Sequence, residues 1–364
     1  MAFSIGLWTI RIPTIRDQLQ TDYLGIGYLM LTFAIGSIIA MLLANYMISK
    51  SSSKYILIYV SLLNWLLWLP VPFVKDLEIF MFLAFLFGVC FGLFEICINL
   101  QATKIETREK KSMMSGFHAF WSLGVLIGSI LTSFFLEWNI SILKNILIYF
   151  IIMLPINLYF SFKLKKDYKK SINDKKNIFF IWPILIFLLA IIAMANALTE
   201  GSVDSWGALY MSDYVQVNGF SVGIATISFN IFMVIGRIYG DWFRDKIGVY
   251  NLLTILMILT IISLIILINY NTILSSVLGF ALLGIGASSI IPIAYSLVSK
   301  IKGIDSGVGI TIVCVAVYGT FIGAPACLGL LANTYGVNNI FIPVLIVFIF
   351  LLIPLSIYKK EFEL

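Results

Sequence analysis

Long apolar segments recur along the whole chain and are separated by short polar stretches. Each segment has about 20 residues, which is enough for a helix to cross a hydrocarbon core about 30 Å thick. The segments are apolar on every face, whereas the strands of a membrane barrel have about ten residues and alternate in polarity. Because lipid offers no hydrogen-bond partner to the backbone, the pattern predicts transmembrane helices.

The pattern predicts eleven complete helices and one partial helix. The complete helices are expected at residues 24–48, 55–74, 79–103, 114–137, 142–162, 178–199, 220–243, 249–269, 272–299, 308–332 and 338–358. Residues 1–15 are interpreted as the outer end of a further helix, because they span only about 22 Å at about 1.5 Å per residue. We therefore expect a first helix whose start is missing from this sequence.

The distribution of positive charges predicts how the helices are oriented in the membrane. All but four of the 24 Lys and Arg residues fall in alternate loops, and the exceptions are Arg11, Arg16, Lys75 and Lys144. Such a bias is typical of cytoplasmic loops. We therefore expect a multi-pass protein of the inner (plasma) membrane with a cytoplasmic C-terminus. The net charge of +6 is attributed to these loops and not to nucleic-acid binding.

Composition supports a membrane protein and argues against an enzyme. Hydrophobic residues make up 61% of the chain and charged residues 12%, against about 45–50% and about 25% in soluble domains. Four cysteines lie inside apolar segments without metal-ligand spacing, so no metal and no cofactor are expected. The sequence has no HExxH, GxSxG or Walker motif, and it has a single histidine. We expect a protein that is not an enzyme.

The chain divides into two halves around one basic stretch. Residues 163–177 are expected to be a cytoplasmic linker between a six-helix half at 1–162 and a second at 178–364. Patterns repeat in the same order in both halves: Gly27 and Phe33 with Gly223 and Phe229, Gly88 with Gly284, and Gly124 and Gly128 with Gly319 and Gly323. Two parallel six-helix repeats are the layout of a large transporter fold.

One charged segment resembles the cytoplasmic loop signature of the major facilitator superfamily. Its core is Asp245-Lys246-x-Gly248, and Asp241 stands where the signature usually has glycine. The corresponding first-half loop, residues 49–52, lacks both the acid and the glycine. The resemblance implies a cytoplasmic gate in which charges hold neighbouring helix ends in one state. The residues assigned to this gate are Gly236, Arg237, Asp241, Asp245, Lys246 and Gly248.

Further motifs resemble the fucose-permease-like branch of this superfamily, and most closely the YbjJ-type membrane proteins. They are Trp8-x-x-x-Ile12-Pro13, Glu95-x-x-x-Asn99, the segment at 116–124, and Glu200-Gly201-x-x-x-Ser205-Trp206. The resemblance covers essentially the whole chain and implies proton-coupled uptake of sugar-like solutes. The acid that fucose permeases carry before the Ile-Pro element is absent here. The Gly-Pro element of drug/proton antiporters is absent too, because Ser129 follows Gly128.

Glu95 is the clearest acid inside an apolar helix. An ionisable group there costs about 2.5–3.5 kcal/mol, which makes it a functional candidate. His118 and Trp121 lie early in the next, antiparallel helix at a similar depth, so the three side chains are expected to share one cavity. Glu95 and His118 are therefore assigned to proton coupling. The alternative is a neutral hydrogen-bonded pair that only fixes the two helices.

Several polar and aromatic side chains are expected to line the solute pathway. The residues assigned to substrate binding are Trp8, Asn99, Trp121, Asn230, Tyr295 and Tyr318. By the internal repeat, Glu95 corresponds to Ile291 and Asn99 to Tyr295. The buried acid is therefore expected in the first half alone.

An extracellular gate is expected at the outer ends of the first and seventh helices. Its residues are Arg11, Glu200, Asp204 and Trp206. Gly201 is expected to end the seventh helix, and Arg11 is expected to pair with Glu200 or to bind an anionic solute. The alternative for Arg11 is a side chain that reaches to the membrane interface.

These features together predict a secondary active transporter of the all-α major facilitator fold. It is expected to move a small polar or sugar-like solute by alternating access, coupled to protons through Glu95, as a monomer in the lipid bilayer. Export of a metabolite or drug by the same superfamily is one alternative. A transport-dead membrane sensor is the other.

Overall fold

The computed structural model describes residues 1–364 except 110–113, 167–182, 299–300, 302–305 and 363–364. Within the described part the chain is helical and contains no strand. Eleven helical spans there are long and apolar enough to cross a membrane. This agrees with the number of complete helices that the hydropathy pattern predicts, and the all-helical fold class is confirmed.

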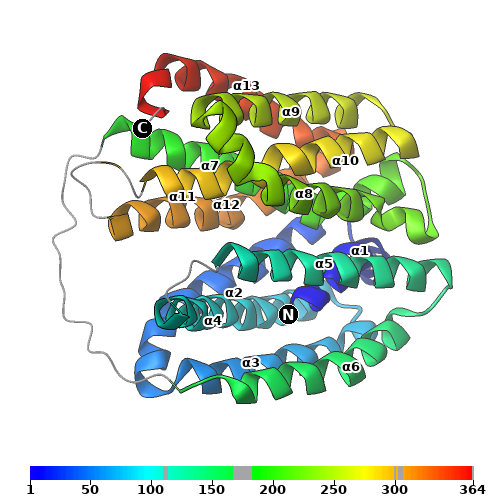
Figure 1. The fold of residues 1–364 in the computed structure, drawn as a ribbon. Coiled ribbons are helices and arrows are strands. Elements are labelled where there is room, and N and C mark those ends of the chain that lie inside the picture. The colour runs from blue at the N-terminus through cyan, green and yellow to red at the C-terminus, as the bar shows by residue number, and fades with distance from the viewer. Residues whose placement is uncertain (110–113, 167–182, 299–300, 302–305, 363–364) are drawn as a thin grey trace. The chain divides into compact units, whose positions relative to one another are not determined.

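The helices fall into two compact units, Met1–Asp174 and Lys175–Leu364 (Figure 1). The first unit contains α1 (Ala2–Leu19), α2 (Tyr23–Lys50), α3 (Ser53–Trp68), α4 (Leu77–Glu109), α5 (Met114–Glu137) and α6 (Ile142–Lys163). The second contains α7 (Ile184–Leu209), α8 (Ile224–Ile247), α9 (Val249–Asn269), α10 (Ile273–Ser288), α11 (Ile290–Val298), α12 (Ser306–Tyr335) and α13 (Phe341–Ile357). The short helices are η1 (Val71–Phe73), η2 (Tyr210–Tyr214), η3 (Gly219–Gly223), η4 (Val337–Ile340) and η5 (Lys359–Phe362).

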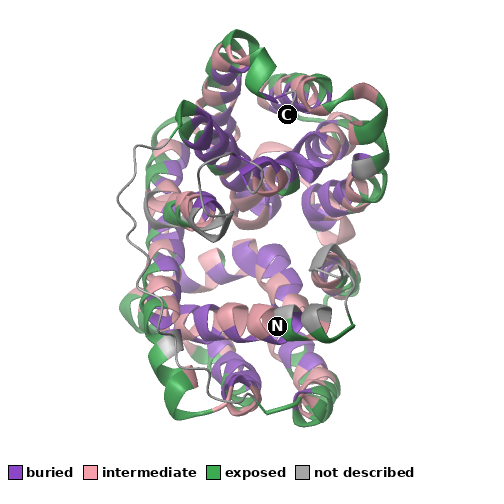
Figure 2. Ribbon diagram, turned by 60° about the vertical axis from the view of Figure 1, so that its left-hand side comes forward, coloured by how far each residue is buried: buried purple, intermediate pink, exposed green. Residues whose placement is uncertain are grey.

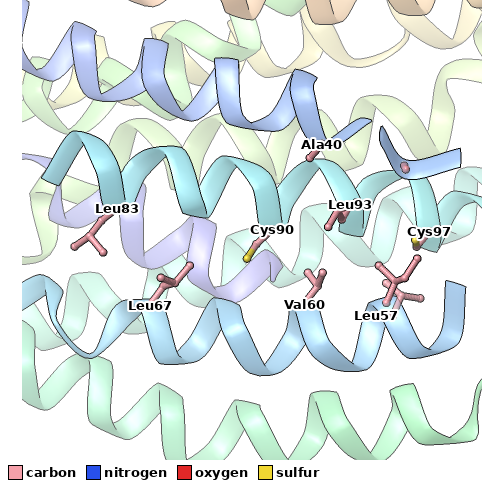
Figure 3. Close-up of a cluster of buried hydrophobic side chains, with 10 residues drawn as sticks. Ala40, Leu57, Val60, Leu67, Leu83, Cys90, Leu93 and Cys97 are labelled. Carbon is pink, nitrogen blue, oxygen red and sulfur yellow. The ribbon is translucent and has the colours of Figure 1, made fainter. Parts of the chain in front are cut away.

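In the first unit α4 packs against both α2 and α3, while α1 packs against α5. Cys90 and Cys97 point from α4 toward α3, where they meet Leu57, Val60 and other apolar side chains (Figure 3). Both cysteines are buried. They therefore act as small apolar packing residues, as the sequence predicted.

In the second unit α10 packs against α8 and α9, and α7 packs against α12 and α11. Buried positions line the faces that helices turn toward one another within each unit, and exposed positions lie on the outer faces (Figure 2). Many exposed side chains are large and apolar, such as Leu42 and Ile357. A membrane protein exposes such side chains because lipid tails solvate them as well as a protein core does.

The two units use glycine in the same way at one helix crossing. A Cβ added at Gly88 in α4 would meet the carbonyl oxygen of Phe33 in α2. A Cβ at Gly284 in α10 would meet the carbonyl oxygen of Phe229 in α8. These four residues are the ones that the repeated patterns align. The repeat therefore preserves a close backbone contact between the second and fourth helices of each unit.

Some helix boundaries differ from the hydropathy prediction. The seventh helix was expected to end at residue 199, but α7 runs to Leu209 and continues as η2. It continues because Trp206 and Tyr210 are fully buried, while the Tyr210 hydroxyl donates to the carbonyl of Leu267 at 2.8 Å. Gly201 therefore lies inside the helix, and the expectation that it breaks the helix is wrong.

Two further differences affect the site. The tenth helix, expected to be continuous over 272–299, is interrupted at Ser289 and forms α10 and α11. α8 extends to Ile247, so the expected loop after residue 243 is reduced to Gly248, whose φ is 82°. Glycine adopts this left-handed conformation without steric cost. A single residue therefore makes the turn from α8 to α9.

Candidate functional site

Glu95 in the first unit lies inside the apolar span Leu77–Ala102 of α4 and is half-buried. The Asn99 side-chain amide donates to its Oε1 atom at 2.9 Å. The two residues are one helical turn apart on the same helix face. The pair places a carboxylate and an amide side by side within an apolar segment.

Aromatic rings flank this pair. The indole of Trp121 in α5 lies 6.1 Å from the ring of Phe91 and 6.0 Å from the ring of Phe94, both in α4. The half-buried Trp121 is therefore next to the helical turn that carries Glu95. The side chain of His118 lies outside the described residues, so its proposed pairing with Glu95 stays a prediction.

Trp8 belongs to the same unit but has a different neighbour. Its ring lies 6.4 Å from that of Phe80, near the start of α4. Glu95 lies about four helical turns further along α4. Trp8 and Trp121 thus contact the same helix at well-separated levels.

The second unit contains an interior ion pair. The Glu200 carboxylate in α7 lies 3.7 Å from the guanidinium of Arg237 in α8. It also accepts a hydrogen bond from the Asn196 side-chain amide at 2.8 Å. The Arg237 Nε donates to the carbonyl oxygen of Ser288, the last residue of α10, at 3.3 Å. This cluster ties three helices of the unit together through charged and polar groups.

Asp204 lies one helical turn beyond Glu200 on α7. It is half-buried, and no hydrogen bond or ion pair reaches its carboxylate from the residues that the structure describes. Glu200 and Asp204 both lie within the span Ile184–Tyr214. The cluster therefore contains two carboxylates and one guanidinium.

This arrangement corrects two sequence-based predictions. Glu200 and Asp204 were placed at the outer end of the seventh helix, but Glu200 lies near the middle of its span because α7 continues past Gly201. A buried acid was expected in the first half alone, yet the second half contains its own. Trp206, also assigned to an outer gate, is fully buried inside the second unit.

Arg11 has partners within its own unit. Its Nη2 donates to the carbonyl oxygen of Ile140 at 2.6 Å, and its Nε donates to Asn145 Oδ1 at 3.2 Å. Only 3% of the residue is exposed, so the alternative of a side chain reaching the interface is wrong. The guanidinium instead fastens α1 to the connection between α5 and α6.

The three residues assigned to the pathway in the second unit differ in their surroundings. Asn230 is buried, and its side-chain amide donates to the Thr226 carbonyl of the same helix at 2.9 Å. The hydroxyl of the half-buried Tyr295 lies 3.3 Å from the sulfur of Cys314. Tyr318 is half-buried in α12. The two tyrosines are partly exposed, whereas Asn230 is largely covered.

The segment that resembles the loop signature serves two different purposes. Added Cβ atoms at Gly236 and Gly240 would meet the side chains of Ser288 and Ser289, so these glycines allow α8 to pack closely at the interruption between α10 and α11. Arg237, between them, belongs to the interior ion pair and not to a loop. The assignment of Arg237 to the cytoplasmic gate stays a prediction.

The end of that segment is exposed. Arg244 pairs with Asp245 at 3.3 Å, and the Lys246 ammonium lies 4.7 Å from the centre of the Trp242 ring. The Asp241 side chain lies outside the described residues. A cavity of about 320 Å³ borders this end and is also lined by Phe362. The assignment of Asp245, Lys246 and Gly248 to a cytoplasmic gate stays a prediction.

Sequence reasoning missed the partnership of Arg237 with Glu200 and the contribution of Asn196. One signal was present, since Arg237 lies within the last turn of the apolar span Gly219–Gly240 and not in a polar loop. The resemblance to a loop signature concealed it. Among the described residues, no group of three or more His, Cys, Asp or Glu side chains is placed to bind a metal ion.

Comparison with known proteins gives consistent results. Residues 1–199 match the family model described as the Major Facilitator Superfamily. The chain is 24% identical over 331 residues to an uncharacterized MFS-type transporter of Yersinia pestis, covering 90% of this chain and 85% of the relative. It is also 24% identical over 341 residues to the membrane protein MosC of Rhizobium meliloti, covering 92% of this chain and 82% of the relative.

Solved structures share the fold. The crystal structure of the nucleoside transporter NupG superimposes with a TM-score of 0.70 at 14% identity, covering 100% of this chain and 97% of NupG. A bacterial homolog of the human lysosomal transporter Spinster, inward-facing and occupied, gives a TM-score of 0.70 at 11% identity, with 99% and 93% coverage. At these identities the likeness concerns the fold.

Proposed function

Because the chain belongs to the major facilitator superfamily of secondary transporters, we propose that it carries a small polar or sugar-like solute together with protons. The transport direction proposed is uptake across the inner membrane by a monomer with a cytoplasmic C-terminus. The solute binds at a site that opens alternately to the two sides of the membrane. Within the superfamily, the proposed branch is the fucose-permease-like one, with the YbjJ-type proteins as the most similar members.

The hydrogen-bonded pair of Glu95 and Asn99 carries this proposal. A carboxylate inside an apolar span is costly, so it is retained where it binds an ion, a proton or a solute. The Asn99 amide donates to Glu95 Oε1, and because this donor is neutral it adds no positive charge that would oppose protonation of the carboxylate. Protonation neutralises the Glu95 carboxylate and lowers the cost of enclosing it in a closed pathway.

Trp121 supports a solute with an apolar ring face. An indole offers a flat surface with a polar N–H at its edge, which suits the apolar face and the hydroxyls of a sugar. Phe91 and Phe94 hold this indole at the level of Glu95. A sugar ring on Trp121 would place its hydroxyls within reach of the carboxylate and the Asn99 amide. In the second unit, the half-buried Tyr295 and Tyr318 are proposed as further solute-binding residues, together with Asn230.

A solute screen followed by two transport assays tests this proposal. The full chain is purified and screened by thermal shift against sugars, polyols, nucleosides and other small polar metabolites. Nucleosides are included because they combine a sugar with a ring and because NupG is a nucleoside transporter. Solutes that stabilise the protein are then measured in proteoliposomes by counterflow, which needs no proton gradient, and by uptake driven by a pH gradient.

Glu95→Gln and Glu78→Gln form a matched pair of variants. Both change a glutamate of α4, but Glu78 is exposed at its start. We expect Glu95→Gln to retain counterflow and to lose pH-driven accumulation, while Glu78→Gln behaves as wild type. Unchanged accumulation in Glu95→Gln would refute coupling through Glu95. Accumulation only under a reversed gradient would indicate an exporter, and absence of counterflow for every bound solute would favour a sensor.

A further inference from the structure

The second unit has a charge imbalance inside its membrane-spanning helices. Arg237 is matched by Glu200 at 3.7 Å, so the carboxylate of Asp204 is left as an uncompensated charge. The other helices that pack against α7 do not supply a second cation: α10, α11, α12 and α13 contain no Lys, Arg, His, Asp or Glu. Their ionisable groups are limited to tyrosines and cysteines, such as Tyr295 and Cys314.

The remaining charged groups near α7 are few. α8 carries Asp241, whose side chain lies outside the described residues, and the charges of its exposed end at Arg244, Asp245 and Lys246. η2 carries Asp213, whose carboxylate accepts a hydrogen bond from Ser212 at 2.6 Å. The one cation that contacts the Glu200–Asp204 face of α7 in the described structure is therefore Arg237.

The cluster is only partly covered by the rest of the protein. The side chains of Glu200 and Arg237 are 25% and 27% exposed, and both lie inside apolar spans. Charged side chains in such spans pair with one another or face water, because exposure to lipid costs about 2.5–3.5 kcal/mol for each charge. Asp204 is also only half-buried, so the described residues do not enclose its carboxylate completely.

The donor set favours a proton over other cations. A metal ion needs several oxygen ligands around it, and the described residues provide no group of three carboxylate, imidazole or thiolate ligands. A proton needs only one carboxylate oxygen. We propose that the second unit contains its own proton-binding site, centred on Asp204 and positioned by the Glu200–Arg237 ion pair.

The proposed step is a simple protonation. The Asp204 carboxylate takes one proton from water on one side of the membrane, becomes a neutral carboxylic acid, and later returns the proton to water on the other side. Before protonation, Asp204 and Glu200 compete for one guanidinium. After protonation, Glu200 and Arg237 form a balanced pair.

The competition for Arg237 also affects the interruption between α10 and α11. Arg237 Nε also donates to the carbonyl of Ser288, which is the last residue of α10 before the interruption at Ser289. A shift of Arg237 toward Asp204 would release that carbonyl. Protonation of Asp204 thereby stabilises one of two arrangements of α7, α8 and the α10–α11 junction, as a proton-driven carrier requires. The inference rests on the proposed function, because a second proton has a role only in a proton-coupled carrier.

Infrared spectroscopy on the full chain in lipid vesicles tests the proton directly and needs no known solute. Spectra are recorded as a function of pH in choline chloride for wild type, Asp204→Asn, Glu95→Gln and the control Asp17→Asn, whose carboxylate is exposed at the end of α1. We expect a pH-dependent band of a protonated carboxyl group that Asp204→Asn lacks. Glu95→Gln and Asp17→Asn should retain this band.

Several outcomes would overturn the inference. If the spectra of Asp204→Asn match those of wild type, Asp204 does not bind the proton. If sodium chloride in place of choline chloride abolishes the band at constant pH, the site binds a metal cation. Asp204→Glu serves where Asp204→Asn does not fold, since it should shift the band without removing it. An unshifted band in Asp204→Glu also contradicts the proposal.

The infrared test of Asp204 can be interpreted separately from the transport test of Glu95. Loss of the band in Asp204→Asn supports the second site even where Glu95→Gln leaves accumulation unchanged and coupling through Glu95 fails. Uncoupling by Glu95→Gln, with an unchanged band in Asp204→Asn, refutes the second site and supports the first. The two proposals therefore fail independently.

Discussion

The Glu200 carboxylate on α7 and the Arg237 guanidinium on α8 lie 3.7 Å apart inside the second unit. Sequence comparison assigns these residues to opposite ends of a transporter, one to an outer gate and the other to an inner loop. Their contact shows instead that the two side chains lie at the same level of the second unit. A charge pair that is neither fully buried nor freely exposed is suited to rearrange when a neighbouring carboxylate gains a proton.

Arg237→Gln should destabilise the protein. Loss of one partner of a fully buried pair costs about 3–5 kcal/mol, and because these side chains are 25% and 27% exposed we expect about 2 kcal/mol here. The thermal unfolding midpoint in detergent should fall accordingly. Arg244→Gln is the control, because its partner Asp245 is 74% exposed and such pairs contribute about 0–1 kcal/mol.

The double variant Glu200→Gln/Arg237→Gln separates loss of the pair from loss of the arginine. It removes both charges of the pair, so its unfolding midpoint should lie nearer to wild type than that of Arg237→Gln. If Arg237→Gln unfolds at the same temperature as Arg244→Gln, the ion pair between Glu200 and Arg237 does not stabilise the fold.

Arg11→Met should weaken the attachment of α1 within the first unit. The substitution keeps an apolar stem but removes the donors to the Ile140 carbonyl and to Asn145. Each buried acceptor that loses its donor costs about 1–3 kcal/mol. Arg16→Met, on the same helix, should cost less, because its ion-pair partner Asp17 is 70% exposed and such pairs contribute about 0–1 kcal/mol. Equal midpoints for the two variants would contradict the anchoring role of Arg11.

Alanine at Gly88 or at Gly284 should destabilise each unit in the same way. The new methyl group meets a backbone carbonyl, at Phe33 or Phe229, and backbone cannot move aside as a flexible side chain can. Overpacking of this kind costs about 1–3 kcal/mol. Gly319→Ala is the control, because an added Cβ there has nothing within 4 Å. Tolerance of alanine at Gly88 and Gly284 would refute the close crossing.

The cysteines should differ in their reactivity toward maleimide in detergent. Cys327 is exposed, whereas Cys90 and Cys97 are buried between α4 and α3. Mass spectrometry after brief labelling of the folded protein should find modification at Cys327 and none at the two buried sites. Labelling of Cys90 and Cys97 should begin only at the unfolding temperature. Early labelling at either of them would show that the core of the first unit is open.

The sequence by itself predicted a helical membrane protein with eleven complete spans, which is the number found in the described residues, and it identified Glu95 with Asn99 as a polar pair. Both follow from local properties. Spans depend on the length of apolar segments, and residues four apart in a helix share one face wherever that helix packs. The repeated Gly88 and Gly284 were recognisable as well, because small residues mark close helix crossings.

Only the tertiary structure decided how the charges of the second half are matched. Hydropathy predicted that the seventh helix ends where Glu200 and Asp204 interrupt the apolar run. A helix continues through polar residues when other helices satisfy them, and Arg237 satisfies Glu200 from α8. Likewise Gly319 aligns with Gly124, yet a Cβ at Gly319 would touch nothing, whereas one at Gly124 would meet Ala2. Pairing and packing depend on which helix faces meet, and no pattern along one helix encodes its neighbour.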